Sequence, residues 1–147
     1  MIVHILAIVV LGLMCGSELN IAAFGHPALK RQPLSVHIPV RASLAATLGR
    51  VMPFWMGGST LLNLLLLLPG HLDKFPWRLA AISFAIQAFA VAFSLVAPVP
   101  INNRIKKWTP GALPADWEAQ EQRWDQYHWF RTIALIAAFA LLVWSFR

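Results

Sequence analysis

Charged residues are scarce in this chain. Lys, Arg, Asp and Glu together make up 12% of its 147 residues, whereas 59% are hydrophobic. Soluble globular domains carry about 25% charged residues, so this balance excludes an ordinary water-soluble fold. The mean hydropathy of +0.63 points the same way and indicates a protein that lies in a lipid bilayer.

Cysteine is almost absent as well. The single Cys15 excludes an intramolecular disulfide, and its apolar surroundings indicate a packed thiol. The sequence has no CxxC pair, no phosphate-binding loop, no nucleophile elbow, no HExxH motif and no internal repeat. None of the enzyme classes marked by these motifs is indicated.

Four apolar stretches are present, at residues 2–24, 51–68, 77–97 and 132–146. Each is near the ~20 residues that cross a bilayer core, and spanning segments must satisfy their own backbone hydrogen bonds. We therefore predict an all-α fold, in which residues 1–147 form a single domain that is a four-helix transmembrane bundle. Ala22 and Ala23 leave open a cleaved secretory signal, but no Lys or Arg precedes the apolar core, which disfavours it.

The distribution of basic residues predicts how the chain lies in the membrane. Lys74, Arg78 and Arg147 fall on one side, and the other basic residues fall around the loops after the first and third apolar stretches. By the positive-inside rule, both larger loops are cytoplasmic and both chain ends lie outside. The cations are divided among loops, which argues against nucleic-acid binding. The residues on the larger-loop side are Lys30, Arg31, Arg41, Arg50, Arg104, Lys106, Lys107, Arg123 and Arg131.

Residues 116–131 carry much of the charge up to the last apolar stretch. Spacings of four and three residues place one stripe of side chains along a single helix face. Apolar residues normally fill such a stripe, but here aromatic rings alternate with an acid, an imidazole and a guanidinium. No Gly or Pro precedes residues 132–146, so we expect one long helix, extended on the cytoplasmic side, whose polar groups point into the bundle. The stripe consists of Trp117, Glu121, Trp124, His128 and Arg131.

Glu18 interrupts the first apolar stretch. At 1.5 Å per residue it lies about 9 Å inside the helix end. An ionisable group at that depth is unfavourable by a few kcal/mol unless it is paired or hydrated, so it marks a functional or interhelical site. A neutral or Arg-paired packing residue is the structural alternative. His26 follows about 80° further round the helix, from which both side chains can face one cavity.

The second apolar stretch is expected to be entered from a surface loop. Pro33, Pro39 and scattered cations in residues 30–50 favour a loop followed by an amphipathic entry, with His37 in contact with water or headgroups. Gly57 and Gly58 are expected at a kink or a close helix contact.

Three further polar residues carry structural expectations. The amides of Asn63 and Gln87 are expected to bond to neighbouring helices, Gln87 alternatively to a ligand, and His71 is expected to be exposed in a short turn.

The polar segment at residues 98–131 opens with prolines that end the third span. Asn102, Asn103 and Arg104 then form a donor-rich corner suited to an oxyanion or a carbonyl, although such residues also cap ordinary loops. We predict that this corner, the first span and the start of the fourth meet around a polar pocket beneath an apolar vault. Flat aromatic surface at its mouth would suit a planar hydrophobic ligand. The aromatic residues are Trp117, Trp124 and Tyr127.

Three sequence patterns are distinctive: GSELN…HPAL in the first span, PVPINNRIKKW after the third, and W…RW…H..R before the fourth. In these patterns the chain resembles the anthrone oxygenase-like family of small four-span membrane proteins. Fungal members of that family are associated with the oxidation of anthrones to anthraquinones by dioxygen. The resemblance covers nearly the whole chain and implies a bacterial member of the family, in the inner membrane. The site positions that it implies are Asn102, Asn103, Arg104, Arg123, Trp124, His128 and Arg131, with Glu18 and His26 at its margin.

The implied chemistry needs a base and a cradle for a developing negative oxygen, because a deprotonated anthrone can pass an electron to dioxygen without a metal. His128 is the leading base candidate, since its ordinary pKa lies near neutrality. Arg131 is expected to hold the oxyanion, assisted by Asn102 or Asn103. Glu18 is expected to orient a histidine or to act as the base itself.

No cofactor is required in this scheme, but a metal version is open. Glu18, His26 and His128 have the two-His-one-carboxylate composition of iron oxygenase sites. The expected partners are the lipid bilayer, a hydrophobic aromatic small molecule, dioxygen and, as an option, further copies of the chain.

Two other functional classes are compatible with the sequence. A proton-coupled transporter would also place an acid such as Glu18 in its first helix, although it has little use for the long polar segment at residues 98–131. A non-enzymatic accessory subunit would use the polar stripe of the last helix to bind a partner chain.

Overall fold

The computed structural model describes residues 2–69 and 76–147, and within these ranges all regular structure is helical. The all-α prediction is therefore confirmed. His71 and Lys74 lie outside the described residues. The elements are α1 (Ile2–Asn20), the π-helix η1 (Ile21–Gly25), α2 (His26–Leu29), α3 (Leu34–Leu65), α4 (Trp77–Val96), α5 (Pro98–Ile105) and α6 (Trp117–Trp144).

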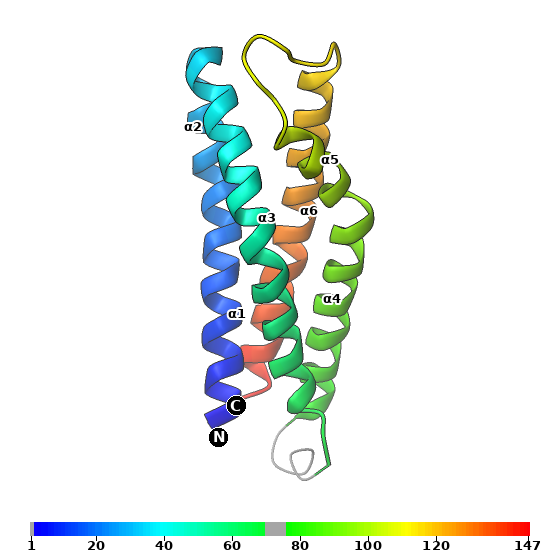
Figure 1. The fold of residues 1–147 in the computed structure, drawn as a ribbon. Helices are drawn as coiled ribbons and strands as arrows, with labels where there is room; N and C mark the ends of the chain where they lie inside the picture. Colours follow the sequence, from blue (N-terminus) through cyan, green and yellow to red (C-terminus); the bar gives the residue numbers. More distant parts are fainter. Residues whose placement is uncertain (1, 70–75) are drawn as a thin grey trace.

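The helices α1, α3, α4 and α6 run lengthwise beside one another (Figure 1). Helix α6 packs against α1 and α4, and α3 packs against the same two helices. The short helix α5 continues from α4 at the upper end of the view, where it contacts α3 and α6. The two ends of the chain lie together at the opposite end (Figure 1).

Three helical segments are long and apolar enough to cross a membrane: Ile2–Leu29, Trp77–Val96 and Trp117–Trp144. The chain is accordingly an integral membrane protein. Four spans were predicted, and the fourth candidate, α3, is not among the three. It has 32 residues, but polar residues such as Arg41, Arg50 and Asn63 interrupt its apolar character.

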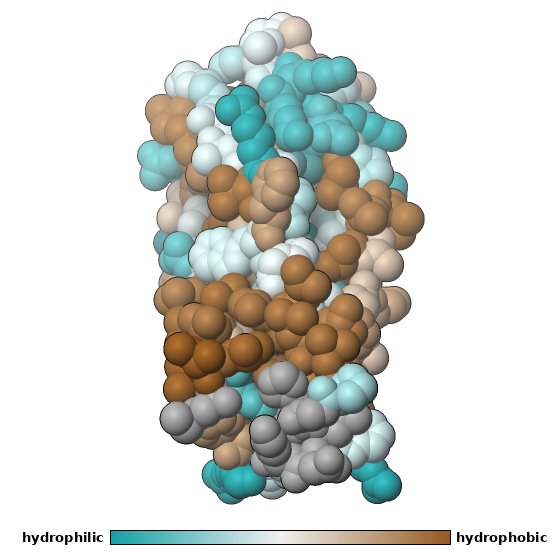
Figure 2. Space-filling model, turned by 60° about the horizontal axis from the view of Figure 1, so that its bottom comes forward, coloured by the Kyte–Doolittle hydropathy of each residue, from teal (hydrophilic) through white to brown (hydrophobic). Residues whose placement is uncertain are grey.

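The surface is apolar where lipid would contact it. Large hydrophobic side chains are exposed on all the long helices, as at Leu13 (62%), Phe54 (83%), Val96 (77%) and Ile133 (62%). Figure 2 shows hydrophobic side chains gathered in a belt over the lower half of the visible face, with hydrophilic ones over the upper part. Exposing apolar surface of this extent is unfavourable in water and favourable in a bilayer.

The surface loop predicted within residues 30–50 is shorter than expected, because it covers residues 30–33 and the rest of the range is helical. Helix α3 begins after Pro33 and passes through Pro39, which is exposed. Ile38, Arg41 and Ala45 recur at helical spacing and are all buried. Their packing compensates for the hydrogen bond that Pro39 removes.

The segment at residues 98–131 also holds more helix than predicted. Helix α4 ends at Val96, before Pro98, as expected. The following eight residues then form α5, whose first turn contains Pro98 and Pro100. Proline is well tolerated there because first-turn N–H groups have no partner within the helix.

Hydrogen bonds between buried polar residues join the long helices. Asn63 Nδ2 on α3 donates to Ser83 Oγ on α4 at 2.9 Å, and Ser83 Oγ donates to the carbonyl of Ala138 on α6 at 2.8 Å. Ser59 Oγ donates to Gln87 Oε1 at 3.2 Å. The expectation that Asn63 and Gln87 bond to neighbouring helices is confirmed.

Close approach of helices occurs at Gly12, where it was not predicted. A Cβ atom there would lie 3.0 Å from Cε2 of Phe139 on α6. Gly57 and Gly58 were expected at a close contact, but a Cβ at either would meet nothing within 4 Å. Of the predicted kink or close contact, the close contact is therefore wrong at these two glycines, because both face open space.

We expect Gly12→Leu to lower the free energy of unfolding by about 1–3 kcal/mol, because the added side chain must displace Phe139 and separate α1 from α6. Gly58→Leu is the matched control, with an expected change within about 0.5 kcal/mol. Denaturation in detergent micelles measures both variants. Equal losses would contradict the assignment of Gly12 to a tight helix contact.

Candidate functional site

The polar stripe of residues 117–131 lies on one continuous helix, α6, as predicted. Four of its five side chains are buried, and Trp117 is partly buried. The helix runs on without a break to Trp144. A series of ionisable and aromatic groups therefore faces the interior between the helices. The four buried members are Glu121, Trp124, His128 and Arg131.

Glu18 and Arg131 form a buried ion pair between α1 and α6. Arg131 Nη2 donates to Glu18 Oε2 at 2.6 Å, and Nε donates to the same oxygen at 3.1 Å. Arg131 Nη1 also donates to Ser94 Oγ on α4 at 3.2 Å. Glu18 is 2% exposed and Arg131 8% exposed, so each charge has the other as its principal counter-ion.

His128 is held beside this pair by both ring nitrogens. Nε2 lies 3.1 Å from the backbone oxygen of Glu18, which can only accept, so Nε2 carries the hydrogen and donates it. Nδ1 of the neutral ring then accepts from Arg131 Nη2 at 3.0 Å. Trp124 stacks on the imidazole, with ring centroids 4.6 Å apart and planes 15° apart. The ring is therefore fixed in tautomer and orientation.

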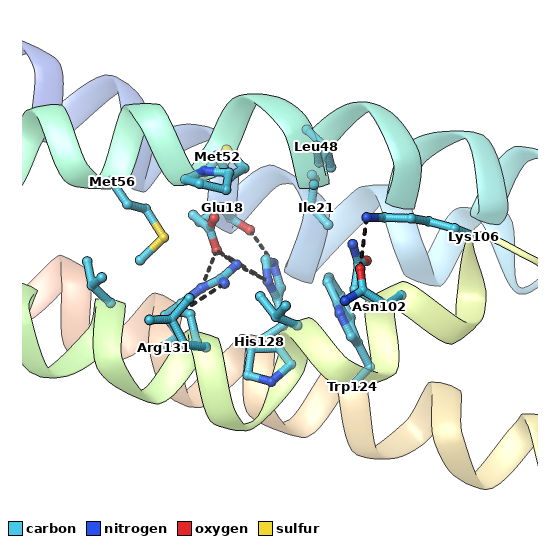
Figure 3. A pocket seen from close by; sticks show the side chains of 18 residues that line it. Glu18, Ile21, Leu48, Met52, Met56, Asn102, Lys106, Trp124, His128 and Arg131 are labelled. Carbon is cyan, nitrogen blue, oxygen red and sulfur yellow. Dashed lines mark hydrogen bonds and ion pairs between the residues drawn. The ribbon is translucent and has the colours of Figure 1, made fainter.

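A cavity of about 210 Å³ adjoins these three residues. Figure 3 shows Glu18, His128 and Arg131 turned toward one another on one side of it, with Met56 toward one end and Lys106 toward the other. Apolar side chains form most of the wall. The lining residues are Glu18, Ile21, Leu48, Gly49, Met52, Pro53, Met56, Val91, Ser94, Leu95, Pro98, Val99, Asn102, Asn103, Lys106, Trp124, His128 and Arg131.

The cavity opens between α3 and the α4–α5 segment, because its exposed lining residues come from these elements. They are Pro53 on α3, Leu95 on α4, and Asn103 and Lys106 at the end of α5. Gly49 allows the elements to approach here, since a Cβ at this position would lie 3.0 Å from Asn102 Nδ2.

The predicted donor corner is only partly at the cavity. Asn102 and Asn103 line it, and Asn102 Nδ2 also donates to the carbonyl of Ala45 at 2.9 Å. Arg104 is exposed and does not line it. The physical reason is that residues 98–105 form a helix, which turns each successive side chain by about 100°.

Three other predicted ligand-binding residues also lie away from the cavity. Arg123 is exposed on α6. Tyr127 packs on Phe93, with ring centroids 5.6 Å apart, and Trp117 packs on Trp108, with ring centroids 6.1 Å apart. Of the three aromatic residues that were predicted at the mouth of the pocket, Trp124 lines the cavity.

A second polar cluster, near the end of the molecule, was not predicted. His37 on α3 is 3% exposed and its Nε2 lies 2.8 Å from Glu121 Oε1. Arg41 lies 3.4 Å from the same oxygen, and its guanidinium stands 4.3 Å from the centre of the Trp124 ring. The expectation that His37 contacts water or headgroups is wrong, because α3 carries it inward to Glu121. The acid on the α6 stripe was the one signal that could have pointed to a buried basic partner.

His26 belongs to this end cluster and not to the cavity. Its Nδ1 donates to Asp125 Oδ1 at 3.0 Å, and Asp125 also pairs with Lys30. The π-helix η1 sets its direction: Pro27 has no N–H to give to the carbonyl of residue 23, and the N–H of His26 bonds to the carbonyl of Ile21, five residues back. The wider turn rotates His26 toward α6.

The proposed metal ligands Glu18, His26 and His128 are not gathered around one point. Within residues 2–69 and 76–147, no group of three or more His, Cys, Asp or Glu side chains is arranged to hold a metal ion. Glu18 points to Arg131, while the rings of His26 and His128 are 6.2 Å apart, centroid to centroid.

We expect Arg131→Gln to lower the free energy of unfolding by about 3–5 kcal/mol, because it leaves the buried Glu18 without its counter-ion. The double variant Glu18→Gln, Arg131→Gln should lose less stability than the two single variants lose together, because it leaves no uncompensated charge. Arg104→Gln, on the exposed side of α5, is the control and should change stability by about 0.5 kcal/mol or less. Denaturation in detergent micelles measures these variants. If the stability losses of the two single variants simply add in the double variant, the pairing is contradicted.

No curated protein and no solved structure matches the chain significantly. A family model described as anthrone oxygenase matches residues 41–141, from α3 through most of α6. This range includes the cavity residues of α3, α4, α5 and α6, while Glu18 and His26 lie before it. Because the match spans well over half of the sequence, the chain belongs to the anthrone oxygenase family.

Proposed function

We propose that this protein is a membrane-embedded oxygenase that acts with dioxygen on a planar hydrophobic substrate of the anthrone or phenol type. Membership of the family suggests an oxygenase-type function. The observation that carries the finer proposal is the cavity with apolar walls, which ends on the Glu18–Arg131 pair and His128. An apolar site with a few convergent polar groups is the usual form of a small-molecule site.

The size and lining of the cavity support a compact aromatic ligand. Its volume of about 210 Å³ is below the ~300–1,000 Å³ of sites for drug-sized ligands, which favours a few fused rings over an extended lipid. Met52, Met56 and Val91 supply apolar contact, and methionine sulfur packs well on aromatic rings. Trp124 adds a flat surface beside His128.

Glu18 is better placed than His128 to take the first proton. Both nitrogens of His128 are engaged by protein groups, whereas Glu18 Oε1 makes no hydrogen bond within the described part of the chain. Moving a proton from the substrate carbon to Glu18 transfers the negative charge to the substrate oxygen, which can then pair with Arg131. The charge facing Arg131 stays constant, so the step needs little electrostatic reorganisation.

His128 keeps a role in this scheme. Its Nδ1 lies 3.2 Å from Glu18 Oε2, so it can accept the proton from Glu18. The substrate anion passes an electron to dioxygen, and recombination forms a carbon–oxygen bond as a peroxide. Return of the proton and loss of water leave a ketone, so one CH₂ group and one O₂ give one C=O group and one H₂O.

The arrangement in the membrane is proposed as follows. Helix α3, with 32 residues, is about 48 Å long at 1.5 Å per residue, so it can cross the bilayer as the fourth member of a single-domain four-helix bundle. The larger loops face the cytoplasm of a bacterial cell and both chain ends lie outside, because the basic residues collect at the α2 and α5 end.

Single cysteines should report this orientation. In intact cells, a membrane-impermeant thiol reagent should label Arg147→Cys and spare Gly111→Cys, which lies in the exposed loop before α6. Both should react after permeabilisation, while the buried native Cys15 stays unlabelled. Labelling of Gly111→Cys alone would reverse the proposed orientation.

Oxygen uptake by the purified protein with anthrone tests the reaction. We expect Glu18→Gln and His128→Asn each to lower the rate about 10²–10⁴-fold, as loss of a proton-transfer group does. Glu118→Gln is the matched control on the exposed side of α6 and should keep the full rate. Wild-type uptake that persists unchanged in Glu18→Gln would rule out this base.

A further inference from the structure

A second, smaller hollow shares a lining residue, His128, with the cavity. It has a volume of about 150 Å³ and is formed by the end of the first helical segment and by α6. His128 therefore borders both spaces. The hollow is lined by Ala22, His26, Pro27, Lys30, Asp125, His128 and Trp129.

His26 lines this hollow and carries an unused proton acceptor. Its Nδ1 donates to Asp125 Oδ1, which fixes the neutral tautomer and leaves a lone pair on Nε2. His26 is 3% exposed, and its Nε2 has no hydrogen-bond partner among the described residues. A buried polar atom without a partner is unfavourable unless water reaches it. The adjoining hollow has room for such a water.

The two histidines are too far apart for a direct hydrogen bond, because their ring centroids are 6.2 Å apart. A proton that passes between them therefore needs a bridging water. Trp124 packs on both imidazoles, with centroids 4.8 Å from His26 and 4.6 Å from His128, and holds them in place. A polar hollow of about 150 Å³ has room for several waters, since one water needs only about 10–15 Å³ of such space.

The hollow also leads outward. Asp125 pairs with Lys30, whose side chain is 38% exposed, so the polar path extends from His26 to the surface at the end of the molecule. The titratable and charged groups that act on His26 come from α6, from α3 and from its own segment. They are Asp125, Glu121, His128, Arg41 and Lys30.

We propose that water in this hollow and His26, oriented by Asp125, relay protons between the Glu18–His128 pair and the surface at Lys30. The relay rests on the proposed function. A proton taken from the substrate carbon passes from Glu18 to His128 Nδ1. The Nε2–H of the imidazolium then leaves its hydrogen bond to the Glu18 backbone oxygen and gives its proton to water in the hollow, and His26 Nε2 accepts it. The same route in reverse returns one proton to the peroxide, so the reaction has no net proton exchange. His26 touches no substrate and acts only through His128.

Deuterium exchange at carbon 2 of each histidine ring tests the hollow without any substrate. Mass spectrometry resolves His26 from His37, which is equally buried (3%) but has its Nε2 engaged by Glu121. We expect His26 to exchange several-fold faster than His37, and Asp125→Asn to shift the pD profile of His26 and leave that of His37 unchanged. Exchange of His26 no faster than that of His37 would show a dry hollow and overturn the relay.

The pH dependence of the oxygen-uptake rate tests the relay separately from the proposed reaction. With anthrone and dioxygen, His26→Gln and Asp125→Asn should lower the oxygen-uptake rate about tenfold and change its pH profile. His37→Gln, the control in the same end cluster but outside the hollow, should keep the wild-type profile. Wild-type activity with unchanged profiles in both variants overturns the relay and leaves the proposed function standing. Absence of uptake by the wild type counts against the proposed function, and the exchange result then decides whether the hydrated path exists.

Discussion

The arrangement of the interior depends on the ion pair between Glu18 and Arg131. A charge alone at the centre of a spanning helix is unfavourable by about 2.5–3.5 kcal/mol on insertion scales. Here one carboxylate oxygen receives two N–H groups of one guanidinium, and that guanidinium also reaches Ser94 and His128. A single set of contacts thus joins α1, α4 and α6 at the level of the cavity and fixes the imidazole beside it.

In lipid, the hydrophobic effect does not drive helices together, and the packing of the rest of the structure reflects this. Polar contacts and close packing take its place. Asn63 and Ser83 connect α3, α4 and α6 at one level, while Glu121 connects α6 to α3 at another. Gly12 brings α1 against Phe139, which follows Ala138 on α6, near the first of these levels. The cavity lies where α3 and α4–α5 leave room beside the central ion pair, so its wall is apolar and its end is charged.

Much of this could be predicted from the sequence, and the failures have physical causes. Glu18 and the α6 stripe were predictable because ionisable groups in an apolar segment have few stable positions other than an interior site. The path of α3 was not, since local breakers such as Pro39 indicate a loop, and only packing against other helices shows that the helix continues. Residues that are neighbours in sequence were also predicted to share one site. Asn102 and Arg104 are two residues apart, but helix α5 turns Asn102 to the cavity and Arg104 outward.

The opening beside Pro53 and Leu95 bears on how the proposed substrate would reach the cavity. Both residues are exposed on helices whose outer surface is apolar, so a molecule dissolved among lipid chains would enter there without passing through water. The relevant concentration is then the one inside the membrane, which partitioning raises for an oily compound. Apparent affinities would therefore vary with the amount of lipid in the sample, and weak binding in the cavity would suffice for high occupancy.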